Sequence, residues 1–192
     1  SKPIGSAVLR YENVVSTNAT ATDLLRRKEI ENGAVIIAKN QTEGKGQRGN
    51  SWSSEDGRNL LCSFVLTPTG LKASNQFLLS AVAALATQHT LAKLLVRLDS
   101  SGTAKIKWPN DVLIDNKKIA GILIENGVQA NEISSSIIGI GINVKQSEFN
   151  GLAHASSIRN HTNSALEIEE VLELLIANMN AFFGLIEVDP SL

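Results

Sequence analysis

The sequence predicts an α+β domain in which a mixed, largely antiparallel β-sheet packs against helices. Apolar runs of strand length come in pairs and triplets, and three segments with helical periodicity separate these groups, without strict alternation of strand and helix. The chain has 192 residues, of which 43% are hydrophobic and 19% are charged. This length is sufficient to bury the core of a single domain over residues 1–192.

Residues in the first half of the chain predict strands at 7–15, 34–38 and 60–66, and helices at about 18–31 and 74–95. The run Ser16-Thr17-Asn18 supplies side chains that commonly cap the start of a helix. The polar, glycine-rich segment 39–59 is longer than most loops inside a compact domain. We therefore expect it to be either functional or disordered.

Residues farther along predict strands at 104–108, 112–126 and 133–144. Asp115-Asn116-Lys117 interrupts the second of these strands with the residues that a hairpin turn prefers. After a polar stretch at 145–163, Ser164 and Glu167 have the spacing of a capping box. The last helix then presents a core-facing stripe made of Val171, Leu172, Leu175, Met179, Phe182 and Phe183.

Composition excludes several classes of protein and site. A formal net charge of −1 gives no overall reason to expect nucleic acid or an anionic membrane as a partner. Cys62 is the only cysteine, which excludes an intramolecular disulfide and a cysteine-rich metal site, and its apolar surroundings predict a buried structural thiol. No signal-type start and no run of about 20 apolar residues is present, so we expect a cytoplasmic location.

The segment Gly44-Lys45-Gly46-Gln47-Arg48-Gly49-Asn50-Ser51-Trp52 formally matches the pattern G-x-G-x-x-G. It neither follows a strand directly nor opens an apolar helix, so a dinucleotide site is not expected. Close-approach glycines, two cations and a tryptophan fit a loop that binds an anion and a ring. The alternative is a solvated, disordered surface loop.

Lys107-Trp108-Pro109-Asn110-Asp111 predicts a turn at the end of a strand, because Pro109 disfavours helical geometry in the residue before it. Asn110 could bond a purine edge or a ribose, and Asp111 could hold Mg²⁺ through a carboxylate oxygen. A simple Asx turn is the alternative reading.

Two further segments are candidates for a ligand site. Lys118 begins a strand that is apolar as far as Glu125, with Gly121 three residues on; it could point inward or be an exposed hairpin lysine. Gly139 and Gly141 alternate on another strand that ends at Asn143. Such glycines clear one face of a strand, either for a ligand or for tight packing. His89, His154 and His161 show no metal-ligand spacing.

The order and spacing of these motifs resemble the biotin protein ligases, the biotin-specific members of the biotin/lipoate ligase family, over roughly residues 7–144. The pair formed by Lys107-Trp108-Pro109-Asn110-Asp111 and Lys118-Ile119-Ala120-Gly121-Ile122-Leu123-Ile124-Glu125 is the most specific part. The resemblance implies a class II synthetase-like catalytic fold. It also implies a monofunctional enzyme that uses Mg·ATP to form biotinyl-5′-AMP and then transfers biotin to a lysine of a biotin carboxyl carrier domain, as in acetyl-CoA carboxylase.

The resemblance also implies roles for particular residues. Lys118 and Arg48 would be the catalytic cations. Those implied to bind biotin are Ser16, Thr17, Asn18, Gln41, Gly44, Lys45, Gly46, Gln47, Lys118 and Gly121. Those implied to bind ATP or the adenylate are Arg48, Asn50, Trp52, Asn110 and Asn143, with Asp111 as a metal ligand.

The sequence departs from the family pattern in two respects. Arg48 is the single arginine of a loop in which family members often have several, so Arg48 and Lys45 are alternatives for the phosphate contact. The chain is also expected to lack both the N-terminal DNA-binding domain of the repressor-type members and the small SH3-like C-terminal domain. Lipoate protein ligase is a rival, although its Arg-Arg-x-Gly-Gly-Gly signature is absent, and a non-catalytic module that binds biotin or its adenylate is another. A homodimer is a further expectation.

Overall fold

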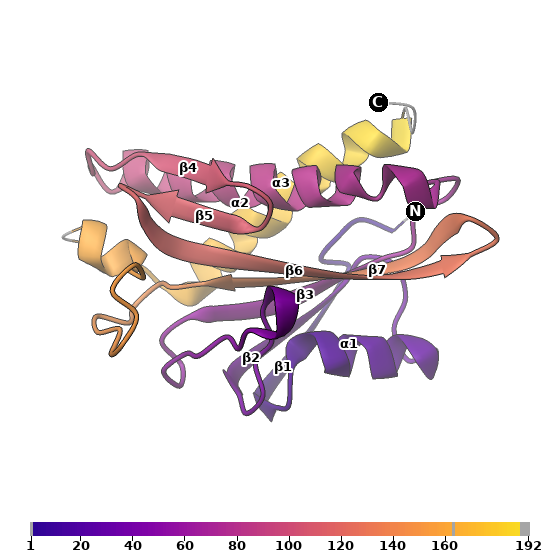
Figure 1. Ribbon diagram of the computed structural model, residues 1–192, viewed down its shortest axis with the longest axis horizontal. Coiled ribbons are helices and arrows are strands. Elements are labelled where there is room, and N and C mark those ends of the chain that lie inside the picture. The colour runs from indigo at the N-terminus through magenta and orange to yellow at the C-terminus, as the bar shows by residue number, and fades with distance from the viewer. Residues whose placement is uncertain (1, 163, 189–192) are drawn as a thin grey trace.

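The computed structural model describes residues 2–162 and 164–188 (Figure 1). In chain order its strands and α-helices are β1 (Ala7–Val14), α1 (Thr17–Arg26), β2 (Ala34–Gln41), β3 (Leu60–Leu66), α2 (Phe77–Arg97), β4 (Ala104–Lys107), β5 (Asp111–Ile114), β6 (Lys117–Gln129), β7 (Glu132–Ile142) and α3 (Ile168–Val188). The strands form one sheet in the order β1-β2-β3-β7-β6-β5-β4. Within the described chain β1 and β2 pair in parallel and the other neighbours are antiparallel, which confirms the predicted class.

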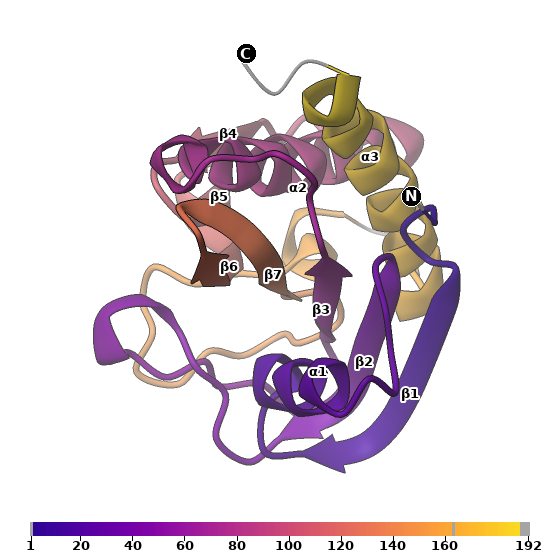
Figure 2. The same cartoon turned by 90° about the vertical axis from the view of Figure 1, so that its right-hand side faces the viewer.

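Helices cover both faces of this sheet. Figure 2 shows α2 and α3 together above the sheet and α1 below it, inside the curve formed by β1, β2 and β3. Side chains alternate along each strand, so one set packs toward α2 and α3 and the other set faces α1. Leu60, Phe64 and Leu66 belong to the larger core beneath α2 and α3, whereas Val65 packs with Ala21 of α1.

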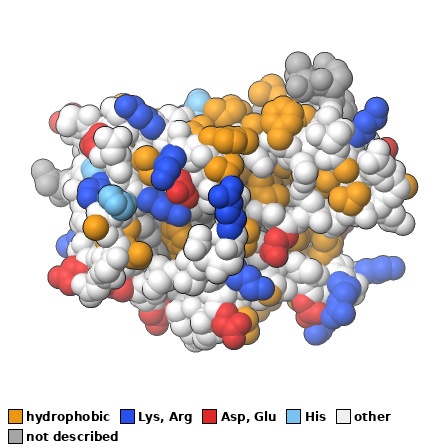
Figure 3. Space-filling model, in the orientation of Figure 1, with side chains coloured by type: hydrophobic (Ala, Val, Ile, Leu, Met, Phe, Trp, Pro, Cys, Tyr) orange, Lys and Arg blue, Asp and Glu red, His pale blue; other side chains and the backbone are white. Residues whose placement is uncertain are grey.

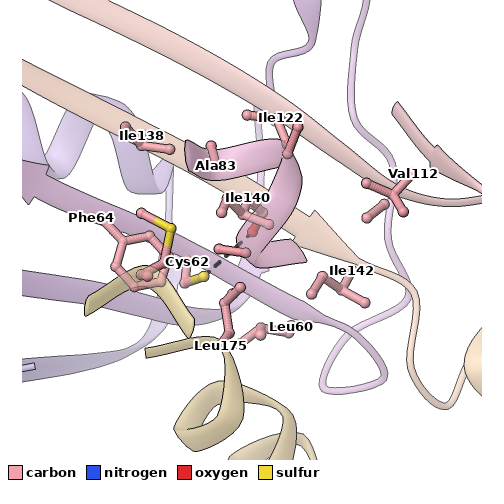
Figure 4. Close-up of a cluster of buried hydrophobic side chains, with 14 of the residues drawn as sticks. Leu60, Cys62, Phe64, Ala83, Val112, Ile122, Ile138, Ile140, Ile142 and Leu175 are labelled. Atoms are coloured by element: carbon pink, nitrogen blue, oxygen red, sulfur yellow. Dashed lines mark hydrogen bonds between the residues drawn. The ribbon is translucent and has the colours of Figure 1, made fainter. Parts of the chain in front are cut away.

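Cys62 lies in the larger core, beside Ile140 and Leu175 (Figure 4). Its Sγ lies 3.5 Å from the carbonyl oxygen of Ile140. Burial raises the pKa of the Cys62 thiol well above its usual range, because the thiolate would lose its hydration. The expected structural thiol is confirmed.

The apolar helix α2 qualifies on length and composition as a segment that could span a membrane, contrary to the expectation from the sequence. Its most apolar window lies within Ala73–Arg97 and is 56% buried inside the molecule. The buried side chains pack against the sheet and α3. This is the environment of a core helix.

Several helix boundaries differ from the prediction, and α2 spans Phe77–Arg97 rather than 74–95. Helix α1 ends at Arg26 rather than near residue 31, because Lys28 adopts a φ of 60° and the N–H of Glu29 bonds back to the carbonyl of Leu24. The prediction of a capping box formed by Ser164 and Glu167 is wrong as well. Helix α3 begins at Ile168, and Glu167 forms an ion pair with Lys145 at 2.6 Å.

Charged side chains of both signs are interspersed on the face shown in Figure 3, with hydrophobic side chains between them.

Candidate functional site

A pocket of about 270 Å³ opens on the face of the sheet that carries α1. Residues far apart in the sequence meet there, from the start of α1, the loop after β2, and the neighbouring strands β5, β6 and β7. Its lining includes most of the residues singled out from the sequence: Ser16, Thr17, Asn18, Gln41, Lys45, Gly46, Gln47, Arg48, Asn50, Trp52, Asn110, Asp111, Lys118 and Gly121.

Three uncharged lining residues, Thr17, Asn18 and Gln41, form a corner of the pocket together with Ser63, which lies buried outside the lining and contacts Thr17 and Asn18. Gln41 Oε1 accepts hydrogen bonds from both the backbone N–H and the hydroxyl of Thr17, at 2.8 and 3.1 Å. The Ser63 hydroxyl lies 2.8 Å from Thr17 Oγ1 and 2.6 Å from Asn18 Oδ1. Thr17, Asn18 and Ser63 are buried, so these contacts fix the corner before any ligand enters.

The floor of the pocket is cleared by glycines. Gly121 of β6 and Gly141 of β7 are register partners, and the indole of Trp52 lies across both. A Cβ on Gly121 would lie 2.7 Å from Trp52 Cζ3, and one on Gly141 would lie 2.5 Å from Trp52 Cε2. Gly139 makes the same room for the amide of Asn18, whose Oδ1 would be 2.4 Å from an added Cβ. The alternating glycines therefore belong to the pocket face.

Packing is what holds Trp52. Its Nε1 is buried and has no hydrogen-bond partner among the described residues. Lys118 Nζ lies 5.6 Å from the centroid of its ring, which is within the range of a cation–π contact.

Lys118 points into the pocket, which decides between the two readings of this residue. Its Nζ lies 2.8 Å from Oδ1 of Asp111, and the two side chains are 35% and 17% exposed. Backbone bonds fix the position of Lys118, because its N–H donates to His154 and its carbonyl accepts from Ser156. The neighbouring Lys117 instead turns outward and donates to the carbonyl of Ala153.

The loop between β2 and β3 closes on itself. Lys45 and Ser51 form an isolated antiparallel bridge, and the N–H of Trp52 donates to the carbonyl of Gly44 at 2.8 Å. Lys45 and Arg48 are exposed at the mouth of the pocket, and neither forms an ion pair among the described residues. The loop is therefore folded and lines the pocket, unlike a disordered surface loop, while its binding of an anion and a ring stays a prediction.

Two residues from the sequence prediction lie outside the lining. Gly44 is buried where the loop closes, and a Cβ there would meet the carbonyl oxygen of Trp52 at 2.3 Å. Asn143 is 3% exposed, and its amide donates to the carbonyl of Ser156 at 2.9 Å. Asn143 thereby supports the segment that positions Lys118.

Sequence reasoning missed Leu123, which lines the pocket, and also Ser63 and Glu125, which lie outside the lining and hydrogen-bond to Asn18. Glu125 Oε2 accepts a hydrogen bond from Asn18 Nδ2 at 2.7 Å. Period-two alternation from Gly121 places Leu123 and Glu125 on the pocket face of β6, and this signal could have found both.

Across the described residues, no group of three or more His, Cys, Asp or Glu side chains could hold a metal.

Residues 11–143 match the sequence model of the Biotin/lipoate A/B protein ligase family. The chain is 35% identical over 139 residues to the bifunctional ligase/repressor BirA of Bacillus spizizenii, covering 72% of this chain and 41% of that protein. It is 34% identical over 167 residues to the biotin–[acetyl-CoA-carboxylase] ligase of Paracoccus denitrificans, covering 83% and 66%. The chain thus spans about two-fifths to two-thirds of the length of these relatives.

Among solved structures, the biotin protein ligase from Aquifex aeolicus in complex with biotin and ATP superposes with a TM-score of 0.77 at 26% identity. The match covers 96% of this chain and 73% of that one. The Leishmania major biotin protein ligase in complex with biotinyl-5-AMP has a TM-score of 0.75 at 23% identity, covering 91% and 73%, which supports the same fold.

Proposed function

This chain belongs to the biotin/lipoate A/B protein ligase family, and on that premise we propose that it adenylates biotin with ATP and passes the biotinyl group to a protein lysine. The observation that carries the proposal is a single pocket that joins the buried uncharged corner to a cationic end at Lys118, Lys45 and Arg48. Biotin has the matching polarity, with an uncharged ureido ring at one end and a carboxylate at the other.

In the first step the biotin carboxylate oxygen attacks the α-phosphorus of ATP, and the bond to pyrophosphate breaks. Both reactants are anionic, so the site has to neutralise charge and hold the two groups in line. Lys118 lies at the cationic end with Asp111 as its partner, and we assign it to the carboxylate and α-phosphate. Arg48 and Lys45 at the mouth are assigned to the phosphates.

The other residues serve to bind and orient. Ser16, Thr17, Asn18 and Gln41 would take the ureido ring, with Gly46 and Gln47 lining the same pocket. The adenine would stack on Trp52, while Asn50 and Asn110 would contact the nucleotide. Asn143, buried behind Lys118, would act by supporting the segment around Ser156.

In the second step the amine of an acceptor lysine attacks the carbonyl carbon of biotinyl-5′-AMP and AMP leaves. No nucleophile of the enzyme is needed, because the substrate carboxylate and the acceptor amine supply both attacking groups. We propose a biotin carboxyl carrier domain, of acetyl-CoA carboxylase or a related carboxylase, as the acceptor. A loop closed over the adenylate would also keep water from the reactive anhydride.

Magnesium would enter with the nucleotide. Mg²⁺ is commonly held by one or two carboxylates together with substrate phosphates, and Asp111 is a carboxylate in the pocket lining. Asp111 is therefore the lining residue that would hold the ion. When bound, Mg²⁺ would neutralise negative charge on the phosphates.

We further propose that the protein acts as a monofunctional ligase in the cytoplasm, with neither nucleic acid nor a membrane as a partner. A net charge of −1 and the mixed charges in Figure 3 support this proposal. The outer strands β1 and β4 each pair on one side, so the sheet also offers two edges for a homodimer.

Exchange of labelled pyrophosphate into ATP tests the proposal. We expect exchange that depends on biotin. Exchange with lipoate but not with biotin would identify a lipoate ligase, and no exchange with either would identify a module that binds without catalysis.

A further inference from the structure

Asn18 belongs to α1, and its side-chain amide lies between residues of two strands, β6 and β3. Asn18 is 3% exposed. Its Nδ2 donates to Glu125 Oε2 at 2.7 Å and approaches the carbonyl of Leu123 at 3.4 Å. On the other side, Asn18 Oδ1 lies 2.6 Å from the hydroxyl of Ser63. These contacts decide which way the amide faces.

Glu125 determines the orientation of the amide. An ionised carboxylate accepts hydrogen bonds and donates none. The Asn18 atom beside Glu125 Oε2 therefore has to be the NH₂ group, and the oxygen has to face Ser63. Glu125 is exposed at its other side, so water can solvate its charge while the carboxylate holds this bond.

From the Asn18 oxygen onward, four oxygen atoms lie in a row and have too few protons to form a hydrogen bond at every contact. Gln41 Oε1, Thr17 Oγ1, Ser63 Oγ and Asn18 Oδ1 make three successive contacts of 3.1, 2.8 and 2.6 Å. Gln41 Oε1 is an acceptor because the backbone N–H of Thr17 donates to it. Only the two hydroxyls carry protons, so the three contacts share two of them. The corner thus has unused capacity to accept hydrogen bonds.

We propose that Glu125 is a positioning residue that keeps this corner an acceptor of hydrogen bonds and so selects a ligand ring with N–H groups. The inference rests on the proposed function and deepens it. The ureido ring of biotin has two N–H donors, whereas the dithiolane ring of lipoate has none. A site that presents unpaired acceptors discriminates strongly against a ring that cannot donate to them.

Loss of Glu125 would do more than remove one bond. An Asn18 amide turned by 180° would place NH₂ beside Ser63, and all three contacts in the row would then have a proton. The turned amide would present a donor where the ring needs an acceptor. A neutral glutamine at position 125 could accept a hydrogen bond from Asn18 Nδ2 or donate one to the oxygen of a turned amide, so it would no longer impose the original orientation.

The test compares Glu125→Ala, Glu125→Gln and a control, Glu132→Ala, in biotin-dependent ATP–pyrophosphate exchange. Glu132 is an exposed glutamate of the same hairpin that lies outside the pocket lining. We expect Glu125→Ala to raise KM for biotin by about tenfold with kcat changed less than about twofold, the scale of one hydrogen bond to a charged group. Glu125→Gln keeps the size of the side chain but can donate a hydrogen bond, so it should also raise KM for biotin. Glu132→Ala should stay within about threefold of the wild-type KM. A wild-type KM in Glu125→Ala or in Glu125→Gln would overturn the inference, as would equal impairment in Glu132→Ala.

A double-mutant cycle tests whether Glu125 acts through Asn18. In the Asn18→Ala background, Glu125→Ala should add less than about twofold to the KM for biotin, whereas independent effects would multiply. Multiplied effects would contradict the role proposed for Glu125. Wild-type exchange with biotin, together with unaltered kinetics in Glu125→Ala, would overturn this inference alone; no exchange in the wild type would overturn the proposed function as well.

Discussion

The contact between Trp52 and the glycines beneath it predicts that Gly141→Ala damages nucleotide binding without unfolding the protein. The added Cβ would lie 2.5 Å from Trp52 Cε2 and 2.7 Å from Cζ2. Carbon atoms in contact prefer a separation of about 3.5 to 4.0 Å, so the indole has to retreat by about 1 Å. A displacement of about 1 Å at a reacting site can cost on the order of 100-fold in rate. We expect KM for ATP to rise by about 10- to 100-fold.

The fold should tolerate this change because Trp52 lies in a loop, which can yield where a packed core could not. We expect the free energy of unfolding to fall by less than about 1 kcal/mol, compared with the ~1–3 kcal/mol typical of overpacking a core. Thermal unfolding measures the loss of stability, and tryptophan fluorescence measures the displacement of the indole. The ATP dependence of pyrophosphate exchange measures KM for ATP. Gly184→Ala is the matched control, since a Cβ at that position in α3 meets nothing within 4 Å. A Gly141→Ala variant with wild-type fluorescence and KM for ATP would refute the reasoning.

Two further predictions concern single side chains. Trp52→Ala should weaken ATP binding far more than biotin binding, because stacking on a base is worth about 1–3 kcal/mol; calorimetric titration of each ligand measures this, and equal losses would argue against the stacking role. Cys62 should resist thiol reagents at pH 8 in the native protein and react once denaturant is added, since burial raises the pKa of its thiol. Rapid labelling of the native protein would show that the thiol is accessible.

Local chemistry allowed much of the fold to be predicted, and its failures have physical causes. Pro109 correctly ends a strand, and β4 stops at Lys107. Helix α1 was predicted to be too long, because its left-handed terminating residue is Lys28 where a glycine is more usual, so the sequence held no stop signal. Ser164 and Glu167 had the spacing of a cap, but the ion pair to Lys145 and the start of α3 at Ile168 are tertiary outcomes.

Site residues could be predicted where a single sequence motif places them together at one strand end or in one loop. Contacts between motifs could not be predicted in this way. The inward direction of Lys118 depends on Asp111, seven residues away across the β5–β6 hairpin, and was left open by the sequence. Ser63 and Glu125 lie 45 and 107 residues from Asn18 in the chain, so their hydrogen bonds follow only from the strand order. Asn143 was assigned to the pocket by its place at a strand end, whereas its amide turns to Ser156.

The central claim is that Lys118 provides the charge for biotin adenylation, and one comparison tests it most directly. Biotin-dependent ATP–pyrophosphate exchange should fall by about 100-fold or more in Lys118→Ala, since one preorganised donor is worth about 3 kcal/mol in a transition state. Lys117→Ala, which removes the neighbouring lysine bonded to Ala153 outside the pocket, should retain wild-type exchange. Full exchange in Lys118→Ala, or equal losses in both variants, would contradict the account.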